Sequence, residues 1–301
     1  MVSIIIIIKN HRIIERLLKE LTRVRKPEKT EIVVVDGSEG KLDDIKNNFP
    51  TVKWVYFYSN KKYTIPEQRN LGINKSKGEI IAFIDVDCLP TKDWLINLIR
   101  PIRENNENIV AGFIKPSRKY PRKLEFDYKG IKNQRYINFA PTMNTAFKRD
   151  VFKKIGNYNE IFSFGGEDTD LCWRALDAGY KIMYNPKAII FHDWGNLSRN
   201  IFRQFTYGRM TFHLLIKYPR RMFRRENAVF LSYLIYILLI PLTFISIYYP
   251  LLIFIPIIEN LREIRSVEIT FETVLFNLIN GIGIITEGLR YFYNKIGKLS
   301  I

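Results

Sequence analysis

The sequence contains few cysteines and comparatively few acids, and each shortage excludes a class of protein. Its 301 residues include two cysteines, Cys88 and Cys172, which cannot form a disulfide framework and lack the spacing of a zinc site. Lys and Arg number 47 against 30 Asp and Glu, so the formal net charge is +17. A chain this basic indicates an anionic partner, such as nucleic acid, anionic lipid headgroups or a phosphorylated small molecule.

We also expect no cleavable signal peptide, because the apolar residues 2–8 form a short run with no basic residue before it. Charge is absent from residues 228–258, a run longer than the ~20 residues that a membrane-spanning helix needs. Pro241 and Pro250 interrupt this run, which therefore predicts a kinked or tilted span. A weaker apolar segment at 269–289 contains acids and amides, and whether it also spans is open.

Residues 196–225 contain no acid, and their basic residues are interleaved with apolar ones. This pattern predicts amphipathic helices that lie on an anionic membrane surface. A nucleic-acid patch has a similar composition, but the adjacent apolar run favours the membrane, and no nucleic acid is expected. If both apolar segments span as a hairpin, the positive-inside rule places the preceding domain in the cytoplasm.

Apolar runs of strand length alternate with helical patterns over the first hundred residues. Such alternation predicts an α/β fold with a Rossmann-like, mostly parallel sheet and flanking helices. The expected strands are residues 2–8, 31–35, 52–57 and 80–84, and the expected helices are 12–24, 41–48 and the segment after Pro66. Farther along, helices are expected at 90–103, 149–155 and 167–178, and strands at 109–114, 144–147, 181–184 and 188–192. Residues 115–138 are basic and irregular. They form either a flap that covers a site or a solvated loop, and the length of the segment favours the flap.

Acids follow two of the expected parallel strands at the point where each strand ends. Asp36 follows one strand, and Asp85 and Asp87 follow another. Ligands of open α/β sheets bind beyond the carboxyl ends of the strands. Carboxylates there suit Mg²⁺ or Mn²⁺, ions that bridge phosphates, although an isolated Asp-x-Asp often only caps a turn. His192 also ends an apolar run, yet a single histidine in that position is more often ordinary than catalytic.

A second group of acids begins a predicted helix. Glu167, Asp168 and Asp170 follow two glycines, and the helix dipole favours negative charge at that end. These acids therefore fit an ordinary first turn as well as a catalytic site, because a carboxylate held at a helix start can also act as a general base.

The motifs taken together resemble family 2 (GT2) inverting glycosyltransferases with the GT-A nucleotide-sugar fold. The resemblance covers about residues 1–215 and depends on the order and spacing of several modest motifs. They are Asp36-Gly37-Ser38, Gln68-Arg69-Asn70-Leu71-Gly72, Asp85-Val86-Asp87, Asn144-Thr145-Ala146-Phe147, Gly166-Glu167-Asp168-Thr169-Asp170, and Pro186 followed by His192.

This resemblance implies a role for each residue of the donor side. Asp36 would hydrogen-bond the nucleobase of the donor, and Arg69 would lie near its diphosphate. Asp85 would face the ribose or the donor sugar, and Asp87 would ligate a divalent Mn²⁺ or Mg²⁺. His192 would be a further metal ligand or diphosphate contact.

The resemblance also implies that Asp168 is the catalytic base, with Glu167 the rival for that role. One departure concerns the first strand, where Ile7-Ile8-Lys9-Asn10 replaces the family's usual Pro-Thr-Tyr-Asn, so the contact to the nucleobase there is open.

The implied protein is a metal-dependent hexosyltransferase with three parts: a GT-A catalytic domain (1–195), basic interfacial helices (196–226) and a transmembrane region (227–301). It would move a sugar from a UDP- or GDP-linked donor to a lipid-linked acceptor, either a glycolipid or a polyprenyl phosphate. Its place would be the cytoplasmic face of the cell membrane. The alternative is a non-catalytic, membrane-anchored binder of nucleotides or RNA on the same scaffold.

Overall fold

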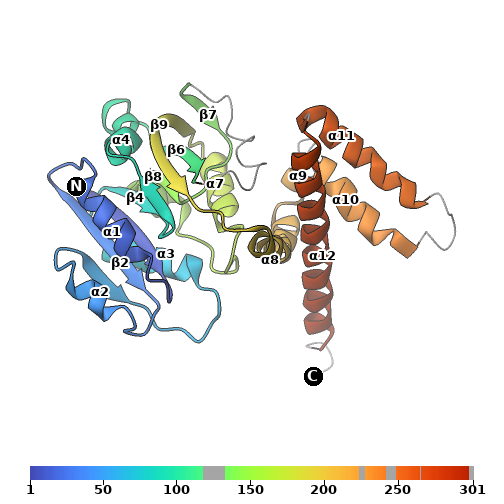
Figure 1. The fold of residues 1–301 in the computed structure, drawn as a ribbon, viewed down its shortest axis with the longest axis horizontal. Helices are drawn as coiled ribbons and strands as arrows, with labels where there is room; N and C mark the ends of the chain where they lie inside the picture. Colours follow the sequence, from blue (N-terminus) through green and yellow to red (C-terminus); the bar gives the residue numbers. More distant parts are fainter. Residues whose placement is uncertain (118–132, 224–227, 242–248, 265, 298–301) are drawn as a thin grey trace. The chain divides into compact units, whose positions relative to one another are not determined.

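The computed structural model describes residues 1–117, 133–223, 228–241, 249–264 and 266–297 (Figure 1). These residues form two compact units. The first, called here the α/β unit, comprises the described residues of 1–117 and 133–193, and the second, called the helical unit, begins at Trp194. Most of the segment in which a flap was predicted, residues 118–132, lies outside the described residues.

The first half of the sheet is parallel and follows the order β3-β2-β1-β4. Its strands are almost continuously apolar and buried, as expected for parallel strands that are covered on both faces. The strands are β1 (Val2–Ile8), β2 (Thr30–Asp36), β3 (Lys53–Tyr56) and β4 (Ile80–Ile84), and the intervening helices are α1 (Ile14–Arg23), α2 (Asp43–Asn47) and α3 (Ile65–Lys75). The βαβ interpretation of this half is confirmed.

The second half of the sheet is mixed, so the described sheet combines four parallel with four antiparallel strand pairs, of which the two longest are parallel. β8 lies antiparallel to both β4 and β6, while β6 and β9 are parallel. The strands are β5 (Cys88–Pro90), β6 (Ile109–Pro116), β7 (Arg135–Ile137), β8 (Asn144–Lys148) and β9 (Ile182–His192), and the helices are α4 (Trp94–Glu104), α6 (Arg149–Ile155) and α7 (Glu167–Asp177). The α/β class with flanking helices is confirmed, and the antiparallel pairs are confined to this second half of the sheet.

Two local expectations in this half were wrong. Pro90 ends strand β5 instead of opening a helix, and α4 begins four residues later at Trp94. The two strands expected around residue 186 are one strand, β9, whose register against β6 jumps from Asn185 to Ile189. A β-bulge accommodates the extra residues, and this device leaves little trace in an apolar pattern.

Asn144 of the Asn-Thr-Ala-Phe motif stabilises this irregular pairing. Its side-chain amide donates to the carbonyls of Phe113 and Ala188 at 3.0 Å each, and Trp94 Nε1 donates to its oxygen at 2.7 Å. Trp94, Asn144 and Ala188 are buried, and a polar group left there without a partner would be costly. The motif residue therefore has a structural role beside the bulge.

The helical unit contains two long helices, α8 (Leu197–Lys217) and α12 (Val267–Gly297), which pack against each other. Glycines permit the close approach: a Cβ at Gly208 would lie 2.0 Å from the carbonyl oxygen of Asn280. Arg209 Nε on α8 pairs with Glu287 on α12 at 2.7 Å. The remaining elements are α9 (Pro219–Met222), α10 (Ala228–Leu238), a 3₁₀ turn (Tyr249–Ile253) and α11 (Phe254–Ile264).

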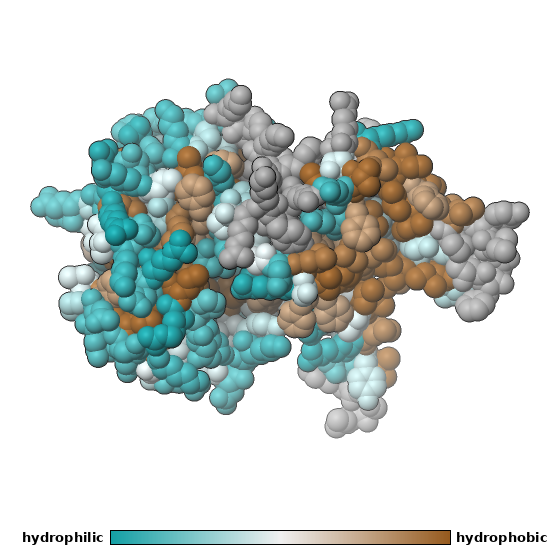
Figure 2. All heavy atoms as spheres, in the orientation of Figure 1, coloured by the Kyte–Doolittle hydropathy of each residue, from teal (hydrophilic) through white to brown (hydrophobic). Residues whose placement is uncertain are grey.

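The stronger candidate for a membrane span is the second apolar segment, whereas the sequence favoured the first. The run 228–258 is not one helix, because α10 ends at Leu238 after about 16 Å, and residues 242–248 lie outside the described residues. Among the described helices, Val267–Ile296 alone is long and apolar enough to cross a membrane, judged by length and composition. Figure 2 shows hydrophobic residues gathered on the helical unit, where exposed side chains include Ile235, Leu238, Leu251, Leu252, Phe254 and Ile255.

Candidate active site

The carboxyl ends of β1, β2 and β4 meet at one edge of the sheet, because the three strands are parallel neighbours. Asp36 ends β2, and Asp85 follows β4 directly. The chain then turns back, with Cys88 N donating to Asp85 O at 3.1 Å. This turn points Asp87 toward the next strand pair, so the two carboxylates of Asp-Val-Asp face different neighbours.

Arg69, in the first turns of α3, is the centre of an acidic group that we call the arginine cluster. Its guanidinium contacts Glu167 Oε1 at 2.7 Å, Asp168 Oδ1 at 3.1 Å and Asp85 Oδ1 at 3.4 Å. Burial by itself would lower the pKa of Arg69, but the charges of Asp168, Asp85 and Glu167 outweigh it and raise the pKa. The cluster thus joins the end of β4 to the start of α7 through one buried cation.

Glu167 and Asp168 occupy different environments although they are adjacent. Glu167 is 4% exposed, and its Oε2 has no hydrogen-bond partner among the described residues. Burial, followed by the charge of Asp168, raises the pKa of Glu167 to about 8. Glu167 therefore holds a proton at neutral pH, which makes it a poor proton acceptor. Burial also raises the pKa of Asp85, with the charge of Arg69 opposing the shift.

Thr142 fixes the orientation of Asp168, a role that the motif comparison missed. Its backbone N donates to Asp168 Oδ2 at 3.1 Å, and its hydroxyl donates to Oδ1 of the same carboxylate. The Thr142 hydroxyl also lies 3.0 Å from the Tyr158 hydroxyl, and the Tyr158 ring packs against the Arg69 guanidinium. Thr142 lies in an irregular segment before β8, where no periodic pattern could indicate its function.

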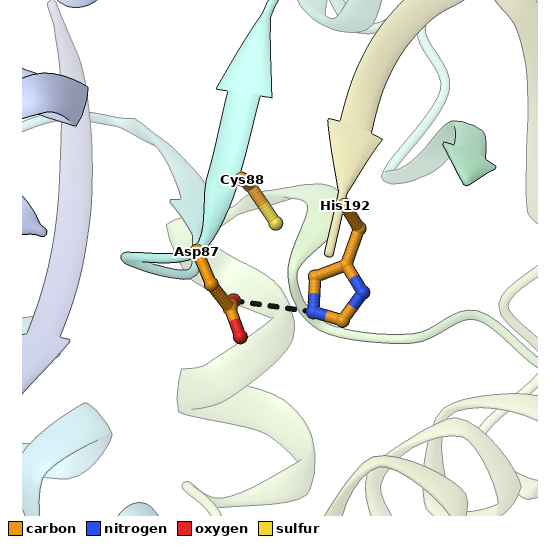
Figure 3. Close-up of side chains that lie close together, drawn as sticks. All are labelled: Asp87, Cys88 and His192. Atoms are coloured by element: carbon orange, nitrogen blue, oxygen red, sulfur yellow. Dashed lines mark ion pairs between the residues drawn. The ribbon is translucent and has the colours of Figure 1, made fainter. Parts of the chain in front are cut away.

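Asp87, Cys88 and His192 form a second group, the histidine cluster (Figure 3). His192 Nε2 lies 3.1 Å from Asp87 Oδ1, and one ligand atom of each residue lies within 4.8 Å of the others. Oxygen, nitrogen and sulfur donors this close together are a donor set that a divalent cation can bind. The donors therefore fit the implied metal. Burial raises the pKa of the Cys88 thiol well above its usual value.

Asp36 is fully buried, and both of its oxygens already accept hydrogen bonds from the protein. Oδ1 accepts from Ser38 N at 2.7 Å, and Oδ2 accepts from Trp54 Nε1 at 3.0 Å. These bonds hold the Asp-Gly-Ser turn beside β3. A contact to a nucleobase would have to share one of these oxygens, so that role stays a prediction.

The model of the family named Glycosyl transferase family 2 matches residues 3–156. The chain belongs to this family. The match covers slightly more than half of the sequence and includes Asp36, Arg69, Asp85 and Asp87. As a member of family 2, the chain is a glycosyltransferase.

Two curated relatives come from Haloferax volcanii. Glycosyltransferase AglE is 29% identical over 236 residues, which is 69% of this chain and 72% of the relative. A glucosyl-dolichyl phosphate glucuronosyltransferase is 24% identical over 218 residues, or 63% of this chain and 68% of the relative. Some relatives are longer than this protein. The part that matches covers 35% of the length of two pre-mycofactocin glycosyltransferases from Mycobacterium tuberculosis.

A solved structure with a similar fold is the mannosyltransferase PcManGT from Pyrobaculum calidifontis in complex with GDP-Man and Mn²⁺. The TM-score is 0.66 at 16% identity, with 93% of this chain and 85% of that chain covered. At this identity the likeness shows the fold alone. It confirms the GT-A architecture expected from the sequence.

Proposed function

We propose that the protein is a metal-dependent, inverting glycosyltransferase that moves a sugar from a UDP- or GDP-linked donor to a lipid-linked acceptor. The observation that carries this proposal is the arginine cluster. Arg69 contacts Asp85 at the strand edge, where nucleotide ligands bind in α/β sheets, and Asp168 at the start of α7. One buried residue, Arg69, thereby contacts both the residue proposed for the donor side and the residue proposed for the acceptor side of the transfer reaction.

The donor side would use Asp36 for the nucleobase, Arg69 near the diphosphate and Asp85 for the ribose or sugar. Asp87 and His192 would hold Mn²⁺ or Mg²⁺, which neutralises the charge that develops on the leaving diphosphate. The proposal is supported by the 3.1 Å contact between Asp87 and His192 and by the similarity in fold to a mannosyltransferase solved with GDP-Man and Mn²⁺.

Asp168 would accept the proton of the acceptor hydroxyl while that oxygen attacks the anomeric carbon. Thr142 and Arg69 hold its carboxylate in one orientation, which positions the base before the acceptor arrives. Glu167 keeps its proton at neutral pH, and this supports Asp168 over Glu167 as the base. A single displacement of this kind inverts the anomeric centre. With an ionised polyprenyl phosphate as acceptor, Asp168 would only orient it.

The helical unit supports the proposed acceptor and location. Exposed apolar side chains at 235–240 and 251–258 and the apolar α12 fit contact with a bilayer. Basic residues such as Arg220 and Arg221 fit an anionic headgroup layer. A relative named for a dolichyl phosphate substrate supports a lipid-linked acceptor. We therefore place residues 1–195 as the catalytic domain at the cytoplasmic face, 196–226 at the interface and 227–301 in the membrane.

The test is a transfer assay with the full chain in detergent. UDP- and GDP-linked sugars are offered with Mn²⁺ or Mg²⁺, first to a polyprenyl phosphate and then to a glycolipid. We expect lipid-linked product and nucleoside diphosphate from one donor, with loss of both after chelation. Product formation at the same rate in the presence of a chelator would contradict the metal dependence. No product with any donor, together with retained RNA affinity, would favour the non-catalytic binder.

A further inference from the structure

The third member of the histidine cluster, Cys88, is assigned no role by the reaction described above. It is fully buried, and it lies directly opposite His192 in the antiparallel register of β5 and β9. Residues that are paired in this way project from the same face of the sheet. Cys88 Sγ is therefore beside the imidazole because of strand register (Figure 3).

Adjacent residues of a strand normally project from opposite faces, so Asp87 and Cys88 should diverge. They do not, because Asp87 lies in the turn that the bond from Cys88 N to Asp85 O closes. The turn brings the Asp87 carboxylate to the side on which Cys88 and His192 lie, with the ligand atoms of all three within 4.8 Å of one another. Two independent features, a turn and a register, thus produce this convergence.

We propose that Cys88 is a sulfur ligand of the divalent cation at Asp87 and His192. This inference rests on the metal site of the proposed function. In a tetrahedral site, metal–ligand bonds of about 2.0–2.3 Å hold the ligands roughly 3.3–3.8 Å apart. Donors within 4.8 Å of one another would therefore approach by about 1 Å to share one ion. When sulfur binds the cation, the thiol proton passes to the solvent, and ion binding releases a proton.

A thiolate changes which cations the site prefers. Thiolate suits Zn²⁺, Co²⁺ and Cd²⁺ far better than Mg²⁺, which prefers oxygen ligands and keeps its waters. The Asp-Cys-His set therefore selects borderline and soft cations over Mg²⁺. With Asp87 and His192 as its only protein ligands, the site would discriminate less between these cations and Mg²⁺.

The test uses Co²⁺ as the probe, added to the full chain in detergent without donor. Cobalt bound to a thiolate shows a sulfur-to-metal charge-transfer band in the near ultraviolet, and we expect this band in the unmodified protein. The chain has only two cysteines, so the control is Cys172→Ser at the other buried thiol, in the core near Ala140. C172S should keep the band, which assigns it to Cys88.

The matched variant Cys88→Ser should lose the charge-transfer band, and its affinity for Cd²⁺ should fall at least ~10-fold, while that for Mg²⁺ changes less than ~2-fold. If C88S does not fold, the unmodified protein and C172S decide the matter, because the band must be present in both. Cobalt binding without the band, together with Mn²⁺-dependent sugar transfer, would overturn the role of Cys88 and leave the proposed function intact. Absence of cobalt binding, both without a nucleotide-sugar donor and in its presence, would overturn the metal site itself.

Discussion

The arginine cluster and the histidine cluster lie at the same sheet edge and both contain an acid of the Asp-Val-Asp motif, yet they balance negative charge differently. In the first, the guanidinium of Arg69 is the built-in cation for Asp85 and Asp168, and it also contacts the Glu167 carboxyl group. In the second, the group within ion-pair distance of Asp87 is an imidazole, and a thiol lies beside it. The comparison separates a region with its own cation, where we propose proton transfer, from a region that suits a metal ion.

The same difference separates the two acids of Asp-Val-Asp, for which we propose different roles. Asp85 belongs to the arginine cluster, whereas Asp87, beyond the turn, belongs to the histidine cluster. An arginine cannot leave or be exchanged, so its cluster is complete in every state of the enzyme. A cation bound at Asp87 can arrive with the donor and leave with the nucleoside diphosphate.

The largest expected effect comes from Asp168→Asn, which removes the proposed base and keeps the shape of its side chain. Transfer to a hydroxyl acceptor should fall by ~10²–10⁴-fold, the usual contribution of a positioned general base. Donor affinity, measured by calorimetry, should be unchanged because the histidine cluster is intact. The exposed Asp177→Asn at the end of α7 is the control. If D168N is active, proton transfer does not take place at the arginine cluster, and the proposed role of Asp168 is contradicted.

Arg69→Met tests whether the arginine cluster depends on its own cation. Removing one partner of a buried ion pair costs about 3–5 kcal/mol, because the remaining charges stay buried and uncompensated. Denaturant unfolding should show this loss, whereas Arg103→Met on the exposed face of α4 should change stability by less than about 0.5 kcal/mol. Equal stability of the two variants would mean that the three acids do not need Arg69.

Thr142→Val removes the hydroxyl that orients Asp168 and keeps the backbone donor. Loss of one hydrogen bond of about 0.5–1.5 kcal/mol should lower kcat by up to about 10-fold with little change in the KM of the donor. Thr142→Ser, which retains the hydroxyl, should restore kcat. A rise in KM alone, or failure of the serine variant to restore activity, would show that Thr142 does not position the base.

Glu167→Gln should have the smallest effect on transfer. Glu167 is protonated at neutral pH, so a neutral amide replaces a neutral carboxyl, and activity at pH 7 should stay within about 3-fold. A loss as large as that of D168N would make Glu167 the base.

The same variant has a defined effect on stability. The pKa of Glu167 rises from an ordinary value of 4.5 to about 8 on folding. Between these values the unfolded chain has lost the proton that the folded chain keeps, so this group lowers stability as pH rises from 4.5 to 8 and adds no further change above 8. The melting temperature of E167Q relative to the unmodified protein should therefore rise over that window. A constant difference would contradict the raised pKa.

Much of the α/β unit was predictable from the sequence because parallel strands buried on both faces are continuous apolar runs. The bounds of β1 and β4 and of helix α6 follow directly from such patterns. The three-residue strands β5 and β7 are too short to produce a pattern, and the β9 bulge depends on its pairing with β6. The antiparallel pairing in the second half of the sheet was therefore not predicted from the sequence.

The candidate site shows the same division. Carboxylates at strand and helix ends could be named from motif spacing, which is how Asp87 and Asp168 were found. Thr142 and Cys88 could not, because their positions depend on a loop path and on strand register. The sequence also suggested residues 228–258 as the main membrane segment, since hydropathy does not show that α10 stops at Leu238.

The most direct test of the central claim is calorimetric titration of the donor with and without Mn²⁺, in the unmodified protein and in Asp87→Ala. Donor binding by the unmodified protein should require Mn²⁺, and D87A should show no Mn²⁺-dependent binding while its fold, measured by circular dichroism, is unchanged. Asp93→Ala, at an exposed position before α4, should bind as the unmodified protein does. Equal Mn²⁺-dependent affinity of D87A and the unmodified protein would contradict the assignment of the metal to the histidine cluster.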